Sequence, residues 1–227
     1  MKIKAFLIAF NRLSSLKAMA EFLADHNLNV ILIDNGSQYQ PLLDWYKTKP
    51  FKIHRLTKEY GHKSLWTSGI INQYKDPHYI VSDHDLDLTG LPPDFVEKLF
   101  QGLENEWAIK SGLSLRVDDL PRNAYTKEVT KWESKWWLTE RDANGFYFSD
   151  VDTTFALYDA ERTRNASEAD FFRAVRSPKP YEVRHLPWYV TPENITPEEQ
   201  FYMDNIGGAS GYWTHHFKRM QQANQWK

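Results

Sequence analysis

The sequence predicts an α/β fold with a twisted, mostly parallel central sheet flanked by helices. Three observations predict it. Short apolar runs alternate with segments of helical periodicity in the first hundred residues. Polar turn residues end several of these runs, as in Asp34-Asn35-Gly36-Ser37. The resulting β-α-β-α-β-α-β order is the one that produces a parallel sheet with right-handed crossovers.

The elements of the first half follow from local patterns. Buried strands are expected at residues 3–10, 29–33, 51–56 and 78–82, where apolar and β-branched residues form short runs. A helix begins at Ser14, because Leu16, Met19, Ala20 and Leu23 recur at helical spacing. Further helices are expected at residues 41–46 and 63–74, and another begins at the prolines of residues 92–93.

The second half is less regular. Strands are expected at residues 107–117, 153–158 and 181–186, and helices at residues 128–138 and in the tail, residues 211–227. Residues 118–121 form a loop. Because no repeat, low-complexity stretch or linker divides the chain, residues 1–227 are predicted to form a single domain.

Composition excludes several functions. Lys and Arg number 28 against 30 Asp and Glu, so no nucleic acid partner is indicated. The absence of cysteine excludes disulfides, thiolate metal sites and a cysteine nucleophile. The first apolar run is too short for a signal peptide and no run is long enough to span a membrane. We therefore expect a soluble cytoplasmic protein.

An acidic run, Ser82-Asp83-His84-Asp85-Leu86-Asp87, directly follows the fourth predicted strand. Open α/β sheets bind ligands at the carboxyl ends of their strands. Asp83 and Asp85 are two residues apart, so in an extended segment their side chains point to the same side. Two carboxylates there suit Mg²⁺ or Mn²⁺ together with phosphate oxygens. The alternative is a solvated acidic turn.

Polar residues also follow the first two strands. The segment Ala9-Phe10-Asn11-Arg12 offers backbone amides and a guanidinium for a base and a phosphate, unless it is a plain turn. Asp34 and Asn35 could hydrogen-bond a base or ribose, or only form a turn. The glycine patterns of dinucleotide-binding and P-loop proteins are absent.

Together, the Phe-Asn-Arg, Ile-Asp-Asn-Gly-Ser and Ser-Asp-His-Asp motifs resemble those of GT-A-fold glycosyltransferases similar to family 2. The resemblance covers about residues 2–88. Residues 117–121, 152–158 and 184–189 also look like segments of small bacterial or viral sugar transferases. The resemblance implies a GT-A-like fold, in which residues 1–88 bind a nucleotide sugar and residues 89–227 bind an acceptor.

The resemblance also implies the roles of individual residues. Asp83 and the neighbouring His84 would lie at the nucleotide sugar, with Asp83 near the ribose and metal. Asp85 would coordinate Mn²⁺ or Mg²⁺ on the diphosphate of a UDP- or GDP-sugar. Lys63 would reach a phosphate, unless it is a surface lysine. His185 would be a third metal ligand, unless it is structural.

The catalytic base departs from the family pattern. Family 2 enzymes usually carry an acidic pair at a helix start, whereas residues 160–172 offer only isolated carboxylates. Asp152, which precedes a strand, is favoured over Asp119 as the base for a carbohydrate acceptor hydroxyl. Trp188, Tyr189 and Trp213 are expected to line the acceptor cleft.

Two alternatives remain. A nucleotidyltransferase that makes the activated sugar would normally carry a glycine-rich basic loop after the first strand, which Phe10-Asn11-Arg12-Leu13 is not. A carbohydrate-binding protein without catalytic activity could use the nine Trp and twelve Tyr residues to stack on sugars. Such a protein would bind glycans independently of nucleotide and metal.

Overall fold

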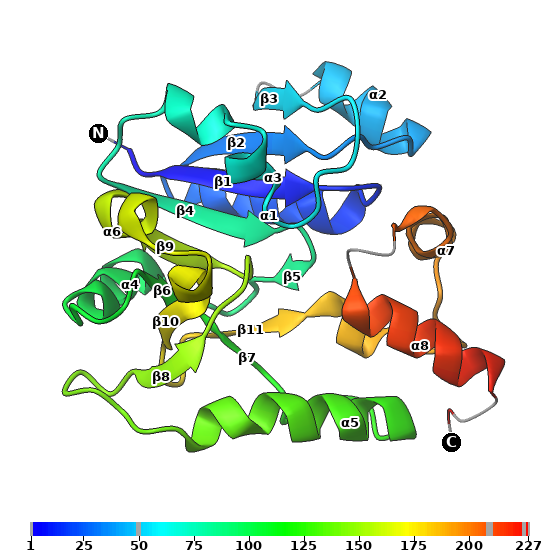
Figure 1. The fold of residues 1–227 in the computed structure, drawn as a ribbon. Helices are drawn as coiled ribbons and strands as arrows, with labels where there is room; N and C mark the ends of the chain where they lie inside the picture. Colours follow the sequence, from blue (N-terminus) through cyan, green and yellow to red (C-terminus); the bar gives the residue numbers. More distant parts are fainter. Residues whose placement is uncertain (1, 49–50, 208–210, 224–225, 227) are drawn as a thin grey trace.

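A computed structural model describes residues 2–48, 51–207, 211–223 and 226. An eight-stranded mixed sheet, ordered β3-β2-β1-β4-β9-β6-β10-β8, runs through the molecule (Figure 1). A second, three-stranded sheet is ordered β5-β11-β7. The predicted α/β fold with a mostly parallel central sheet is confirmed.

The first half of the chain builds a parallel block. Its strands are β1 (Lys4–Ala9), β2 (Asn29–Asp34), β3 (Lys52–Arg55) and β4 (His78–Asp83). Strand β1 pairs in parallel with β2 and β4, and β2 pairs in parallel with β3. The carboxyl ends of β1, β2 and β4 therefore meet at one edge, where the motifs predicted from the sequence lie.

The second half extends the same sheet. Strand β9 (Ala156–Asp159) runs antiparallel to both β4 and β6 (Lys110–Gly112). Strand β10 (Arg173–Arg176) is parallel to β6 and antiparallel to β8 (Tyr147–Asp150). The small sheet joins β5 (Leu86–Asp87), β7 (Ser114–Leu115) and β11 (Glu182–His185). It connects the acidic run to the second half.

Helices cover both faces of the large sheet, and a further group of helices lies apart from it. The α-helices are α1 (Ser14–Asp25), α2 (Gln40–Thr48), α3 (Ser64–Thr67), α4 (Phe95–Leu103), α5 (Ala124–Glu133), α6 (Ala160–Asn165), α7 (Pro197–Asn205) and α8 (Tyr212–Gln222). The 3₁₀ helices are η1 (Ile70–Gln73), η2 (Ser134–Leu138), η3 (Ala169–Phe172) and η4 (Leu186–Tyr189). Helices α5, α7 and α8 stand apart from the sheet in Figure 1.

Alternation along β1 explains the two apolar layers. Ala5, Leu7 and Ala9 join the core that includes α1 and α4, whereas Phe6 and Ile8 join the core under α3, η1 and η3. Successive side chains of a strand point to opposite faces, so a continuous apolar run fits a strand covered on both sides.

Two predicted elements are interrupted. The helix expected at residues 63–74 is divided into α3 and η1, because Gly69 takes a left-handed backbone with φ of 74°. The strand expected at residues 107–117 is divided into β6 and β7. Leu113, between them, donates its N–H to Phe155, after which the chain leaves the large sheet and β7 pairs with β11.

Other boundaries also differ. Helix α5 starts four residues before the expected position, because Asn123 and Thr126 form a capping box. Strands β8 and β10 and helices α6 and α7 were not predicted; the last begins at Pro197 behind a Thr196 cap. The predicted terminal helix is confirmed as α8, although residues 224–225 and 227 lie outside the described residues. Within the described chain, every helix is too short or too polar to cross a membrane.

Candidate functional site

A cavity of about 580 Å³ opens at the carboxyl edge of β1, β2 and β4. We call it the main cavity. The strand ends contribute Ile8, Phe10 and Asn35, and the acidic run contributes Asp83, His84 and Asp85. The second half of the chain contributes Asp152, His185 and an aromatic group consisting of Trp132, Trp136, Trp188, Tyr212 and Trp213. Residues from both halves of the sequence therefore share one cavity.

Asp83 lies at the end of β4 and is held by the loop before β9. The Thr153 hydroxyl donates to the two carboxylate oxygens of Asp83 at 3.0 and 2.9 Å, and the Asp83 N–H donates to the Thr153 carbonyl at 3.0 Å. Burial raises the pKa of Asp83 well above its ordinary value, and the charges of Asp85 and Asp152 raise it further. Three carboxylates thus line one cavity, and their combined negative charge would favour a cation there.

Asp85 has one paired and one free oxygen. Its Oδ2 accepts from Arg12 Nη1 at 3.0 Å, and its Oδ1 lies 3.6 Å from His185 Nε2 without a hydrogen bond. Burial acts to raise the pKa of Asp85, but electrostatic interactions with His185 and with the Arg12 guanidinium outweigh burial and lower it. The side chain is therefore an ionised carboxylate with one oxygen available to a ligand.

His84 is fastened to the first strand. Its Nδ1 lies 2.8 Å from the Ile8 carbonyl, so the neutral ring donates there. Burial lowers the pKa of His84 to about 4, which keeps the ring uncharged at neutral pH. Its buried Nε2 has no hydrogen-bond partner among the described residues. The bond to Ile8 fixes the acidic run against β1.

Arg12 is buried, with 3% of its surface exposed. Its Nε and Nη2 donate to both carboxylate oxygens of Glu199 at 2.8 and 2.6 Å, and its guanidinium lies 3.4 Å over the Tyr202 ring. Because Nη1 bonds to Asp85, the guanidinium joins α7 to the acidic run. The structure places Arg12 behind the cavity wall rather than among the lining residues.

The turns after β1 and β2 brace each other. Asn11, with φ of 51°, accepts from the N–H groups of Gln38 and Tyr39 at 2.7 and 3.1 Å. Asp34 is fully buried, which raises the pKa of its carboxyl, and it pairs with Arg55 at 3.2 Å. The side chains of Asn11 and Asp34, like the buried Ala9, lie outside the cavity lining.

Asn35 reaches the main cavity and pins the loop after β3. Its Oδ1 accepts from the Tyr60 N–H at 2.7 Å, and its Nδ2 donates to the Gly61 carbonyl at 3.0 Å. Lys63, two residues further along, lies with its Nζ 4.3 Å from the centre of the Phe171 ring. Lys63 is not one of the lining residues.

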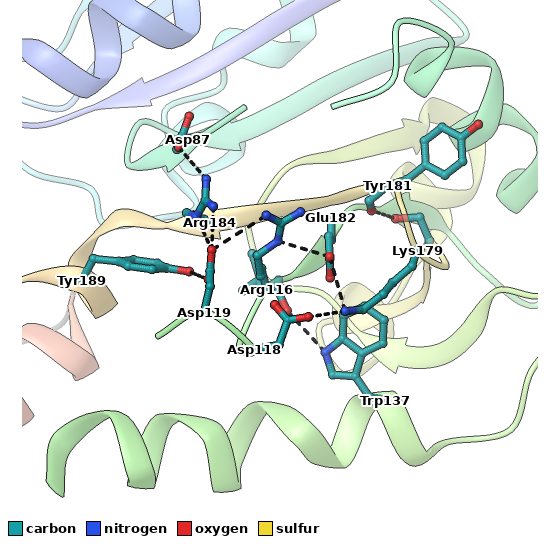
Figure 2. A network of polar contacts seen from close by, with 12 residues as sticks. Asp87, Arg116, Asp118, Asp119, Trp137, Lys179, Tyr181, Glu182, Arg184 and Tyr189 are labelled. Carbon is teal, nitrogen blue, oxygen red and sulfur yellow. Dashed lines mark hydrogen bonds and ion pairs between the residues drawn. The ribbon is translucent and has the colours of Figure 1, made fainter. Parts of the chain in front are cut away.

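The two candidate bases occupy different places. Asp152 lines the cavity with about half of its side chain exposed, and its Oδ1 lies 3.4 Å from His62 Nε2. Asp119 instead accepts from Arg184 and from the Tyr189 hydroxyl, each at 2.6 Å, in a polar network away from the cavity lining (Figure 2). Tyr189 belongs to the same network.

The other expected acceptor residues do line the main cavity. Trp188 is almost fully buried, and its ring centre lies 6.3 Å from that of Trp213 and 4.7 Å from that of His185. Trp188 therefore joins the aromatic group to the acidic run.

Sequence reasoning missed several lining residues. His62 had no signal beyond its proximity to Lys63. Trp132 and Trp136 were visible as two indoles four residues apart in a predicted helix, a spacing that places both on one face. Tyr212 lies within the predicted terminal helix. None of these residues was assigned to the site from the sequence.

The oxygen and nitrogen atoms at the acidic run are of the types that bind divalent cations. Asp85 Oδ1 and His185 Nδ1 are buried without hydrogen-bond partners, and Asp83 adds a second carboxylate. Among the described residues, however, no group of three or more His, Asp or Glu side chains is arranged to hold a metal ion. Two carboxylates suffice where phosphate oxygens complete the coordination, as is usual for Mg²⁺.

Comparisons with known proteins support the fold. No protein-family model matches the sequence, and no curated protein sequence matches it. Among solved structures, residues 1–349 of S. aureus TarS, a GT-A glycosyltransferase, are similar with a TM-score of 0.50 and 12% identity, over 95% of this chain and 68% of that one. A synthetase for CMP:2-keto-3-deoxy-manno-octonic acid, complexed with CTP, has a TM-score of 0.42 and 11% identity, over 100% and 88% of the chains. The fold is GT-A-like.

Proposed function

We propose that the protein is a metal-dependent glycosyltransferase that moves a sugar from a nucleotide-diphosphate sugar to a carbohydrate acceptor. One observation carries the proposal. Asp83 and Asp85 line the main cavity together with Asp152, at the carboxyl end of β4, where burial and then the charges of Asp85 and Asp152 raise the pKa of Asp83. A divalent cation would offset the charge of these carboxylates, and the oxygens of a diphosphate would complete its coordination.

The donor would occupy the end of the cavity formed by the strands. Phe10 and Asn35 line this end and offer an apolar ring and an amide to a nucleoside. Asp83 and Asp85 would hold Mn²⁺ or Mg²⁺, which as a Lewis acid stabilises the charge on a leaving nucleoside diphosphate. His185 lies against Asp85 and completes the polar wall.

The acceptor would approach from the aromatic side. Asp152 is the cavity carboxylate whose side chain is most open to solvent among the three, so it can accept a proton from an incoming hydroxyl. His62 Nε2, at 3.4 Å, can orient this carboxylate. Asp119, bound to Arg184 and Tyr189 outside the lining, is the weaker candidate.

A thermal-shift screen tests the donor site. UDP and GDP are measured with and without Mn²⁺ on the unmodified protein and on Asp85→Asn. Ligand at a hundred times its dissociation constant stabilises a protein by about 2.7 kcal/mol. For a chain of this size that corresponds to a rise in melting temperature of roughly 5–10 °C. We expect a metal-dependent rise that the variant loses.

Asp44→Asn is the matched control, because Asp44 is an exposed carboxylate whose partners among the described residues are its helix neighbours Lys47 and Gln40. It should keep the full shift. An undiminished shift in Asp85→Asn would remove Asp85 from the site. A response to nucleoside triphosphates alone would favour a nucleotidyltransferase instead.

A further inference from the structure

Two large aromatic side chains lie exposed on the walls of the main cavity. Trp132 of α5 is 53% exposed and Tyr212 of α8 is 68% exposed. Apart from them, the large hydrophobic side chains that the described chain exposes are Tyr60, Trp107 and Leu138, and none of these lines the cavity. Exposed aromatic rings in a polar cavity indicate a ligand with apolar faces.

A chain of contacts leads from the acidic site to these rings. The Asp150 carbonyl, two residues before Asp152, accepts from Arg176 Nε and Nη2 at 3.1 and 2.9 Å. The Arg176 guanidinium lies 5.5 Å from the ring centre of Trp136. Trp136 is therefore linked through Arg176 to the segment that carries Asp152, and Trp132 lines the same cavity four residues earlier in the chain.

The spacing of the two indoles suits successive rings of a chain. Trp132 lies in α5 and Trp136 in the adjoining 3₁₀ helix η2, so the backbone advances about 6–8 Å between them. The Lys135 Nζ lies 3.3 Å from the Trp132 ring centre and 4.4 Å from that of Trp136, so the two indoles face a common space. A lysine on exposed aromatic faces is held by only about 0.5–1 kcal/mol, so a ligand can displace it.

Buried polar groups lie beside the indoles. Glu133 and Arg176, which form an ion pair, line the same cavity with 2% and 7% exposure. Burial raises the pKa of Glu133. A pair of fixed donors and acceptors next to flat apolar faces matches a sugar ring, which presents hydroxyls at its edge and C–H groups on its face.

We infer that Trp136, Trp132 and Tyr212 form an extended acceptor subsite for a saccharide of at least two rings. The inference rests on the proposed function. The reacting sugar lies at Asp152 beside Trp136, and the preceding sugar of the acceptor stacks on Trp132, with Tyr212 on the wall contributed by α8. The acceptor is accordingly an oligosaccharide or a glycan chain end, not a monosaccharide.

A glycan array that carries mono- to hexasaccharides of varied composition, probed with the labelled full chain, tests this subsite. We expect binding that strengthens from one ring to two or more and that Trp132→Ala and Tyr212→Ala each weaken by roughly tenfold, the loss of one stacked ring. The matched control is Trp107→Ala, because Trp107 is 45% exposed and packs on Phe148 outside the cavity.

The nucleotide thermal shift is measured on the same variants. Glycan binding that is absent, independent of chain length, or unchanged in Trp132→Ala overturns the subsite, even where the nucleotide shift persists. Length-dependent binding lost in Trp132→Ala, with no nucleotide shift in the unmodified protein, supports the saccharide subsite but refutes the transferase. Retention of the nucleotide shift in Trp132→Ala with loss of glycan binding supports both.

Discussion

Replacing Arg12 by methionine should destabilise the protein even without a ligand. The guanidinium is buried between two carboxylates, Asp85 at 3.0 Å and Glu199 at 2.6 Å. Methionine keeps much of the apolar stem but removes the guanidinium that lies over Tyr202 and leaves both carboxylates without their counter-charge. Removing one partner of a buried ion pair costs about 3–5 kcal/mol, because the remaining charge stays desolvated. We expect a loss of stability in this range.

Equilibrium unfolding in urea measures this loss, and a melting scan should show a decrease of roughly 6–20 °C for a chain of this size. The control is Lys47→Met, which removes an ion pair whose side chains are 71% and 56% exposed. Exposed pairs contribute about 0–1 kcal/mol. If Arg12→Met changes the free energy of unfolding no more than Lys47→Met does, the buried pair does not stabilise α7 against the acidic run.

Three further outcomes follow from the site. Asp83→Asn should raise the melting temperature of the unliganded protein at neutral pH and abolish the nucleotide shift. Because the pKa of Asp83 is raised in the folded state, Asp83 contributes favourably to stability below its unfolded pKa of about 4, and this contribution is lost as pH rises through the folded pKa. The stability advantage of the variant should therefore grow with pH. A difference in melting temperature between the two proteins that stays constant from pH 4 to 8 would contradict this. Asn35→Ala removes the two hydrogen bonds that hold the loop at Tyr60 and Gly61. It should weaken nucleotide binding by roughly tenfold in calorimetry, the equivalent of one to two hydrogen bonds. Equal affinity in the variant would limit Asn35 to a structural role. Asp152→Asn should slow transfer 10²–10⁴-fold with unchanged nucleotide affinity, whereas Asp119→Asn should not, and the reverse result would move the base.

The parallel half of the fold was predictable because its signals are local. Several apolar runs of the first half end in a turn signal, and the strands fall within a residue or two of the expected positions, as with β1 at Lys4–Ala9. The second half defeats the same approach. Strand β10 begins with Arg173 and ends with Arg176, whose side chain is buried only because Glu133 and the Asp150 carbonyl receive it. That compensation comes from distant residues.

The candidate site divides in the same way. The acidic run could be located from its place after a strand, since the position of a strand end is a local property. The partners of that run could not. Arg12 bonds to Glu199, which is 187 positions away on a helix that was not predicted, and Thr153 reaches Asp83 across a strand pairing. Asp119 and Tyr189 were expected at the site because each follows a predicted strand, but they hydrogen-bond to each other away from the cavity lining.

Some of the buried polar atoms that lack hydrogen-bond partners lie where the proposed ligands would bind. The described residues that line the main cavity include four with a buried polar atom that has no hydrogen-bond partner: His84, Asp85, His185 and Trp188. Each such atom costs free energy in the unliganded protein, and the raised pKa of Asp83 shows that like charges add to this cost. Arg12 offsets part of this cost by pairing with Asp85 Oδ2, which leaves the buried Asp85 Oδ1 without a hydrogen-bond partner. A site that lowers the stability of the unliganded fold is expected to be stabilised when its ligand binds. A cation would supply the positive charge, and a diphosphate the polar contacts, that these atoms lack.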